Sequence, residues 1–164
     1  MQKNISENVK VSDCTAKNIN EIIQIQTECN LSIWSKNDYL GELERADSIF
    51  KIAQMTNGKI IGFALLRLLI GNSNASNDSF DSSEILNIAV RQTFQHKGIG
   101  QIIFDEILRE LERKNITEIW LEVRESNGNA INFYQKNSFE MQFERKNYYS
   151  NPTENAGIFR RSIN

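Results

Sequence analysis

Residues 84–123 contain a strand, a glycine-bearing turn, a helix and a second strand, in the sequence EILNIAVRQTFQHKGIGQIIFDEILRELERKNITEIWLEV. We expect the helix to cover 98–114, because apolar residues recur there with the 3.6-residue period of an amphipathic helix. Residues 84–90 and 118–123 are strand-like, and apolar residues alternate in the second of them. Two strands joined by such a helix lie parallel with a right-handed crossover, so this unit predicts an α/β domain with a mixed sheet.

The other predicted elements lie on both sides of this unit. The pattern of apolar residues predicts strands near Val9–Val11 and over 48–56, 59–69, 140–148 and 157–162, and helices over 17–29, from Ser35 towards Arg45, and from Ser126 or Asn127 to Lys136. The capping box that begins at Ser35 marks a helix start, and Asn57-Gly58 favours a hairpin. The polar segment 71–83 is predicted to be a loop.

Length and composition limit the classes of protein to consider. With 164 residues and 40% hydrophobic residues, the chain is expected to form one domain over 1–164, with residues 1–8 disordered. Two cysteines and one histidine are too few for a zinc site, so no metal is expected. The net charge of −2 argues against a nucleic-acid binder. No signal peptide or membrane span is visible, so we expect a cytoplasmic protein without a membrane partner.

The turn Gln95-His96-Lys97-Gly98-Ile99-Gly100 is the strongest candidate for a binding site. Glycines allow the backbone to approach a ligand closely, and the free N–H groups at a helix start attract anions such as a pyrophosphate. A tight strand-to-helix turn without a ligand explains the same residues. The third glycine of a dinucleotide-binding turn and the Lys-Ser or Lys-Thr of a P-loop are missing.

Four motifs together carry a resemblance to a known family: Leu86-Asn87-Ile88-Ala89-Val90, the turn 95–100, Trp120 to Asn127, and Ala130-Ile131-Asn132-Phe133-Tyr134. In order and spacing this segment, about 84–139, resembles the GCN5-related N-acetyltransferases (GNAT). Trp34-Ser35, Leu121–Arg124 and Arg145–Tyr149 resemble the RimI type, which acetylates the N-terminal alanine of a small-subunit ribosomal protein. The resemblance implies a mixed, mostly antiparallel sheet of about six or seven strands flanked by four helices.

The resemblance also implies roles for individual residues. Glu122 matches the family's general base, and Tyr134 matches its general acid. Trp34, Tyr148 and Tyr149 are candidates for substrate binding. The residues expected to bind the co-substrate acetyl-coenzyme A are Ile88, Ala89, Val90, Gln95, His96, Lys97, Gly98, Ile99, Gly100 and Asn127.

The chemistry of acetyl transfer suits these residue types, although each has a structural explanation as well. A carboxylate can accept the proton of an amine whose pKa is ~8, and a tyrosine can protonate the departing thiolate. Glu122 can instead form a salt bridge, and Tyr134 can simply pack in the core. Trp34 can anchor the first two helices, and Tyr148 and Tyr149 can pack at a strand end. Cys14 and Cys29 are far from every motif, so we expect direct transfer rather than an acetyl-cysteine.

Three features depart from the family pattern. His96 stands where the RimI type often has arginine. Ser138 replaces a glycine after the last helix, so we expect Asn137 to adopt the left-handed conformation instead. The loop 71–83 is longer than expected.

Three functions remain open from the sequence. The preferred one is acetylation of a protein N-terminus, by a monomer or a dimer. The alternatives are acetylation of a free small amine, such as a polyamine, an amino acid or an antibiotic, and a sensor that binds acetyl-coenzyme A without catalysis.

Overall fold

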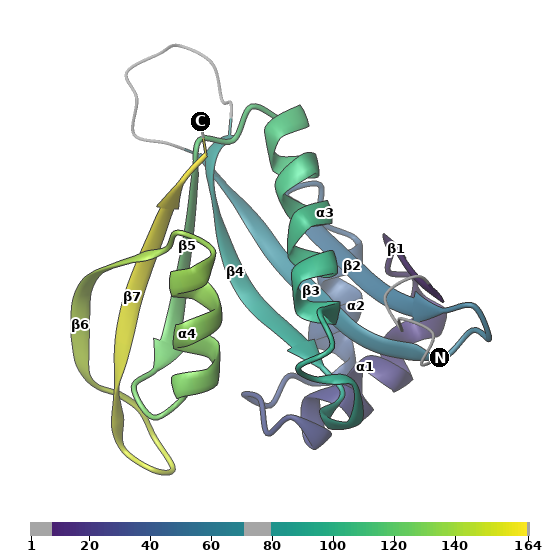
Figure 1. Ribbon diagram of the computed structural model, residues 1–164, viewed down its shortest axis with the longest axis horizontal. Helices are drawn as coiled ribbons and strands as arrows, with labels where there is room; N and C mark the ends of the chain where they lie inside the picture. The colour runs from purple at the N-terminus through teal and green to yellow at the C-terminus, as the bar shows by residue number, and fades with distance from the viewer. Residues whose placement is uncertain (1–7, 71–79, 164) are drawn as a thin grey trace.

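The computed structural model describes residues 8–70 and 80–163 (Figure 1). Two short 3-10 turns, Ala16–Asn18 and Gln92–Phe94, precede helices α1 and α3. The helices and strands are β1 (Val9–Asp13), α1 (Ile19–Glu28), α2 (Lys36–Leu43), β2 (Ser48–Met55), β3 (Ile60–Ile70), β4 (Phe80–Val90), α3 (Ile99–Arg113), β5 (Glu118–Arg124), α4 (Gly128–Lys136), β6 (Glu140–Tyr149) and β7 (Glu154–Ser162).

The strands of the described residues form one sheet in the order β1-β2-β3-β4-β5-β7-β6. β4 and β5 are parallel, and the other neighbouring strands are antiparallel. Helix α3 connects the parallel pair. The mixed sheet, the parallel pair and the four helices confirm the predicted fold class.

The helices cover both faces of this sheet. Figure 1 shows α3 and α4 in front of the sheet and α1 and α2 behind β2, β3 and β4. Each face has its own apolar core, one built around Ile103, Phe104 and Ile107 of α3 and the other around Ile22 and Ile25 of α1. Burial along β5 alternates, with Ile119, Leu121 and Val123 buried beneath the front helices. Trp120, Glu122 and Arg124 therefore lie together on the back face.

Local signals in the sequence placed several boundaries correctly. Ser35 accepts a hydrogen bond from the Asp38 amide, and the Asp38 carboxylate accepts one from the Ser35 amide, so the predicted capping box begins α2. Asn57-Gly58 connects β2 to β3, and Gly58 has a φ of 89° that favours glycine.

Three local expectations were wrong. Residues 80–83 belong to β4 rather than to a loop, because they pair with β3 and, from Ser82, with β5. Asn8 is ordered, because its carbonyl accepts a hydrogen bond from the Thr56 amide. The rest of the predicted loop, 71–79, and of the predicted disordered end, 1–7, lies outside the described residues.

The third correction concerns the end of α4. Asn137 has a φ of −95°, and Ser138 itself adopts the left-handed conformation, with a φ of 62°. The Phe139 amide donates to the Tyr134 carbonyl at 3.0 Å, and the Ser138 amide donates to the Gln135 carbonyl at 3.0 Å. This pair of bonds is the Schellman motif, which requires the left-handed residue one position after the helix cap. Ser138 adopts this unfavourable conformation because the motif requires a left-handed residue at its position.

Candidate active site

The parallel strands separate before they end. β4 and β5 pair only from Ser82 to Ile85 on β4, although β4 continues to Val90. The register against β3 leaves Leu86 as an extra residue, and such a bulge bends a strand and increases its twist. Figure 1 shows β4 and β5 diverging beyond the paired segment, with α3 and α4 on the two sides of the divergence.

A groove of about 750 Å³ lies at this divergence. Its lining includes most of the residues predicted to bind the co-substrate, namely Ile88, Ala89, Val90, Gln95, His96, Gly98, Gly100 and Asn127, together with Tyr134. Lys97 and Ile99 are directed elsewhere. The Lys97 ammonium donates to the Thr93 carbonyl at 2.7 Å, and the Ile99 side chain is buried in the core.

The end of β4 directs backbone groups into the groove. The Arg91 amide donates to the Ile61 carbonyl of β3, whereas the Val90 carbonyl accepts from Gln95 Nε2 on the opposite side. Because successive residues of a strand alternate their backbone groups between the two neighbours, the amides of Ile88 and Val90 face the groove. By the same alternation the backbone groups of Ala89 face β3.

The start of α3 offers free hydrogen-bond donors. Its N-cap residue, Gly98, has a φ of 79°, and no side chain caps the helix. By contrast, Ser35 caps α2 and Asn127 caps α4 through their side chains. A Cβ added at Gly98 would meet no atom within 4 Å. Uncapped amides beside open space, at the positive end of a 15-residue helix, suit an anionic group such as a phosphate.

Asn127 and Tyr134 belong to the helix on the other side of the groove. The Asn127 carboxamide oxygen accepts from the Ala130 amide at 3.2 Å and so begins α4. Tyr134 packs against Phe133 and Phe139, with ring centroids 5.6 and 5.5 Å away. Burial raises the pKa of the Tyr134 hydroxyl, and the nearby Tyr149 raises it further. This hydroxyl therefore keeps its proton at neutral pH and can donate it.

Glu122 lies on the back face of β5 and forms an ion pair with Arg145 of β6. A hydrogen bond to the Glu122 carboxylate raises the pKa of the Tyr148 hydroxyl, and the Arg145 guanidinium lies 5.4 Å from the Tyr148 ring. Burial, followed by the charge of Glu122, raises the pKa of Tyr149 to about 12. The candidate base thus lies beside both tyrosines that were predicted to bind substrate.

Two charged residues of this cluster were missed in the sequence analysis. Arg145 was noted only as part of a motif, and its pairing with Glu122 depends on the register of three strands. Glu84 of β4 lies on the same face, directly opposite Trp120. Burial, and then the charge of Glu122, raises the pKa of Glu84. The one available signal for Glu84 was its position as a charged residue at the start of the predicted strand 84–90.

Trp34 lies away from the groove, between the first two helices. Its ring contacts that of Tyr39 at 5.5 Å, and the Gln26 side chain hydrogen-bonds both its amide and its carbonyl. Trp34 also borders a second hollow of about 510 Å³ between α2 and Arg67. These contacts support the reading of Trp34 as an anchor for the helix pair.

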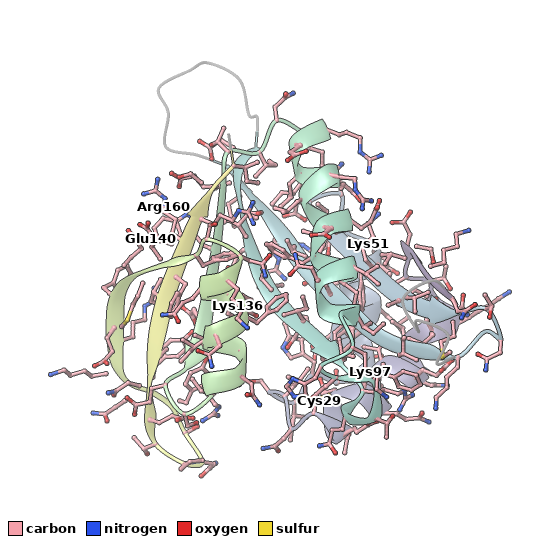
Figure 2. All side chains as sticks on the ribbon, in the orientation of Figure 1. Cys29, Lys51, Lys97, Lys136, Glu140 and Arg160 are labelled. Atoms are coloured by element: carbon pink, nitrogen blue, oxygen red, sulfur yellow. The ribbon has the colours of Figure 1, made fainter. Side chains whose placement is uncertain are left out.

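One expectation about the cysteines was wrong. Cys29, at the end of α1, lines the groove, and its thiol donates to the Val90 carbonyl at 3.2 Å. Figure 2 shows Cys29 and Lys97 at the same lower end of the molecule. Burial, and then the charge of Glu28, raises the pKa of the Cys29 thiol. Cys14 is buried at the other end of the α1 region, with a pKa raised to about 12 by burial.

Within 8–70 and 80–163, no three His, Cys, Asp or Glu side chains converge to form a metal site. None of the helices in this part of the chain is long and apolar enough to cross a membrane.

Comparison with known proteins gives consistent matches. The family described as Acetyltransferase (GNAT) matches residues 19–139. The [ribosomal protein bS18]-alanine N-acetyltransferase of Haemophilus influenzae is 30% identical over 90% of this chain and 94% of its own length.

Solved structures agree with the sequence matches. The crystal structure of the ribosomal-protein-S18-alanine N-acetyltransferase of Escherichia coli has a TM-score of 0.81, at 25% identity over 94% of both chains. Arabidopsis thaliana NAA60 in complex with acetyl-CoA shares the fold with a TM-score of 0.83, at 14% identity over 94% of this chain and 98% of its own chain. With a family match over most of its length and the predicted groove in place, this chain belongs to the acetyltransferase (GNAT) family.

Proposed function

We propose that the protein transfers the acetyl group of acetyl-coenzyme A to the N-terminal α-amine of a protein, with ribosomal protein bS18 as the leading candidate acceptor. One observation carries the proposal: the Haemophilus influenzae relative, which this chain matches over 94% of its length, is named for acetylating an alanine of bS18. The Escherichia coli structure that shares the fold is named for the same reaction.

The groove suits a long, anionic co-substrate. The uncapped amides around Gly98 would hold the pyrophosphate, and the backbone of Ile88 and Val90 would hold the extended arm. Acetyl-coenzyme A supplies its acetyl group as a thioester, which an amine can attack directly. A fixed backbone N–H near the end of β4 can stabilise the negative charge that develops on the carbonyl oxygen.

Glu122 is the proposed proton acceptor. An α-amine has a pKa of ~8, so at neutral pH much of it is an unreactive ammonium. The ammonium passes one proton to the Glu122 carboxylate, directly or through a water, and leaves a neutral amine and a neutral carboxyl group. The lysine ε-amine has a pKa about two units higher, so the same carboxylate deprotonates it less readily.

Tyr134 is the proposed proton donor. Tyr134 lines the groove, and the raised pKa of its hydroxyl keeps the proton in place. The proton passes to the sulfur of the departing thiolate, and the proton that the nitrogen loses as the amide forms restores the Tyr134 hydroxyl, directly or through water. Tyr149 lies near both proposed groups, because it raises the pKa of Tyr134 and its own pKa is raised by the charge of Glu122. The raised pKa of the Cys29 thiol leaves little thiolate at neutral pH, which supports direct transfer over an acetyl-cysteine.

The experiment that tests this function compares acceptors. Peptides that begin with alanine or with other residues are incubated with acetyl-coenzyme A beside free polyamines and amino acids, and release of coenzyme A is followed. We expect the peptides with a small first residue to react fastest, and mass spectrometry to locate the acetyl group on the α-amine. Reaction of free polyamines without reaction of any peptide would establish the small-amine function instead.

A further inference from the structure

The carboxylate of Glu122, the proposed proton acceptor, is already paired with a cation. The guanidinium of Arg145 pairs with Glu122, and it reaches over from the edge strand β6 across the intervening β7. The Arg145 side chain is 49% exposed, whereas that of Glu122 is 20% exposed. The guanidinium therefore lies on the solvent side of the carboxylate, where an acceptor amine would approach.

A second carboxylate makes this place favourable for a cation. Glu84 lies near Glu122, and the charges of Arg67 and Arg145 act on it as well. Arg67 is already engaged in an ion pair with the buried Glu42. Of the two cations that affect the pKa of Glu84, Arg145 is therefore the one that Glu84 shares with Glu122.

We propose that Arg145 is a positioning residue that occupies, in the acceptor-free enzyme, the place of the acceptor's ammonium group. The inference rests on the proposed function. It implies that the acceptor enters protonated and displaces the guanidinium from Glu122. An ammonium and a guanidinium make the same kind of charge-assisted hydrogen bond to a carboxylate, so one can replace the other.

The surroundings of Arg145 permit this exchange. The Tyr148 ring, 5.4 Å from the guanidinium, offers the displaced cation a favourable π face. The first nine residues of β6 are exposed. Arg145 can therefore change rotamer without repacking a core, and the two carboxylates remain to bind the ammonium.

In this proposal the Arg145 guanidinium and the ammonium group of the acceptor compete for the Glu122 carboxylate. Arg145→Gln removes the competitor and leaves both carboxylates. The KM for a peptide that begins with alanine should fall about two- to fivefold, the change in affinity that a half-exposed ion pair accounts for. Arg145→Lys keeps a cation beside Glu122 and should stay close to the wild-type KM.

Arg160→Gln is the matched control, because Arg160 also lies on the back face and pairs with Glu118 at 2.7 Å. Figure 2 shows Arg160 towards the far end of β7. This variant should leave the KM for the peptide unchanged. Melting temperature and its rise with acetyl-coenzyme A establish that each variant is folded and binds the co-substrate.

Two further measurements separate displacement from a structural role. A peptide that lacks its α-amino group should bind wild type and Arg145→Gln equally in calorimetry, because it carries no competing cation. In a Glu122→Gln background, Arg145→Gln should no longer strengthen binding of the unmodified peptide. A KM that rises or stays unchanged in Arg145→Gln overturns the inference, whereas a wild-type enzyme that acetylates no peptide overturns the proposed function itself.

Discussion

The thiol of Cys29 donates a hydrogen bond to the carbonyl oxygen of Val90 at 3.2 Å, and this contact joins the end of α1 to the end of β4 at the groove. The same carbonyl accepts from Gln95 Nε2 at 2.9 Å. The cysteine thus has a packing partner beside the site, and its raised pKa makes it a poor nucleophile.

Replacing this thiol tests for a covalent route. Cys29→Ser keeps a donor for the Val90 carbonyl, so we expect turnover to remain within about twofold of wild type, a change of under 0.5 kcal/mol. Intact-mass spectrometry of wild type with acetyl-coenzyme A and no acceptor should show no acetylated enzyme. A large loss of turnover, together with an acetyl group on Cys29 in the wild type, would establish an acetyl-cysteine.

Two variants that differ only in charge test whether the start of α3 binds the phosphates of acetyl-coenzyme A. Gly98 has a φ of 79°, and asparagine and aspartate both tolerate this region better than other residues. Gly98→Asp should abolish the rise in melting temperature that acetyl-coenzyme A causes, because its carboxylate repels the phosphates. Gly98→Asn should retain part of that rise.

The unliganded proteins provide the control for this pair. An aspartate at a helix start is favourable by about 0.3–1 kcal/mol, so Gly98→Asp should melt no lower than Gly98→Asn without ligand. Equal ligand-induced shifts in the two variants would show that the phosphates bind elsewhere.

The sequence was most informative where local patterns decide the structure. The helical period of α3, the alternation of β5 and the capping box at Ser35 each depend on neighbouring residues, and each predicted its element correctly. Phe80–Ser83 was missed because Asp81, Ser82 and Ser83 have the composition of a loop. Pairing with strands on both sides overrides that composition.

Long-range contacts explain what the sequence missed at the site. Cys29 and Val90 are 61 residues apart, and their contact follows from how α1 packs on the sheet. The pairing of Glu122 with Arg145 requires β7, the last strand in the chain, to lie between β5 and β6. No motif or period encodes that order of strands, so the ion pair was not predictable from the sequence.

The left-handed serine after α4 predicts a stabilising substitution. Ser138 has a φ of 62°, whereas the equivalent positions after α1 and α3 are Asn30 and Asn115, which tolerate this conformation better. Ser138→Gly should raise the free energy of unfolding by about 0.5–1 kcal/mol, after allowing for the greater freedom of glycine in the unfolded chain. Urea denaturation measures the change, and Ser138→Ala, which keeps a Cβ, should bring no such gain.

The hydroxyl of Tyr134 is tested by its removal and by pH. Tyr134→Phe keeps the ring contacts with Phe133 and Phe139, so acetyl-coenzyme A should bind almost as tightly as to wild type. Loss of a general acid should lower kcat about a hundredfold or more. Because burial raises the pKa of this hydroxyl above its ordinary value of about 10, it remains protonated as pH rises, and the fold loss should be constant from about pH 6 to about pH 9.

A second buried tyrosine gives the matched control for this prediction. The hydroxyl of Tyr39 donates to Gln26 at 2.7 Å between the first two helices, and burial raises its pKa as well. Tyr39→Phe should cost about 1 kcal/mol of stability through the lost hydrogen bond and leave kcat close to wild type. Equal losses of kcat in the two variants would mean that Tyr134 acts through packing. A large loss confined to Tyr134→Phe identifies its hydroxyl as the group that protonates the thiolate, since the two substitutions remove the same atom from similarly buried rings.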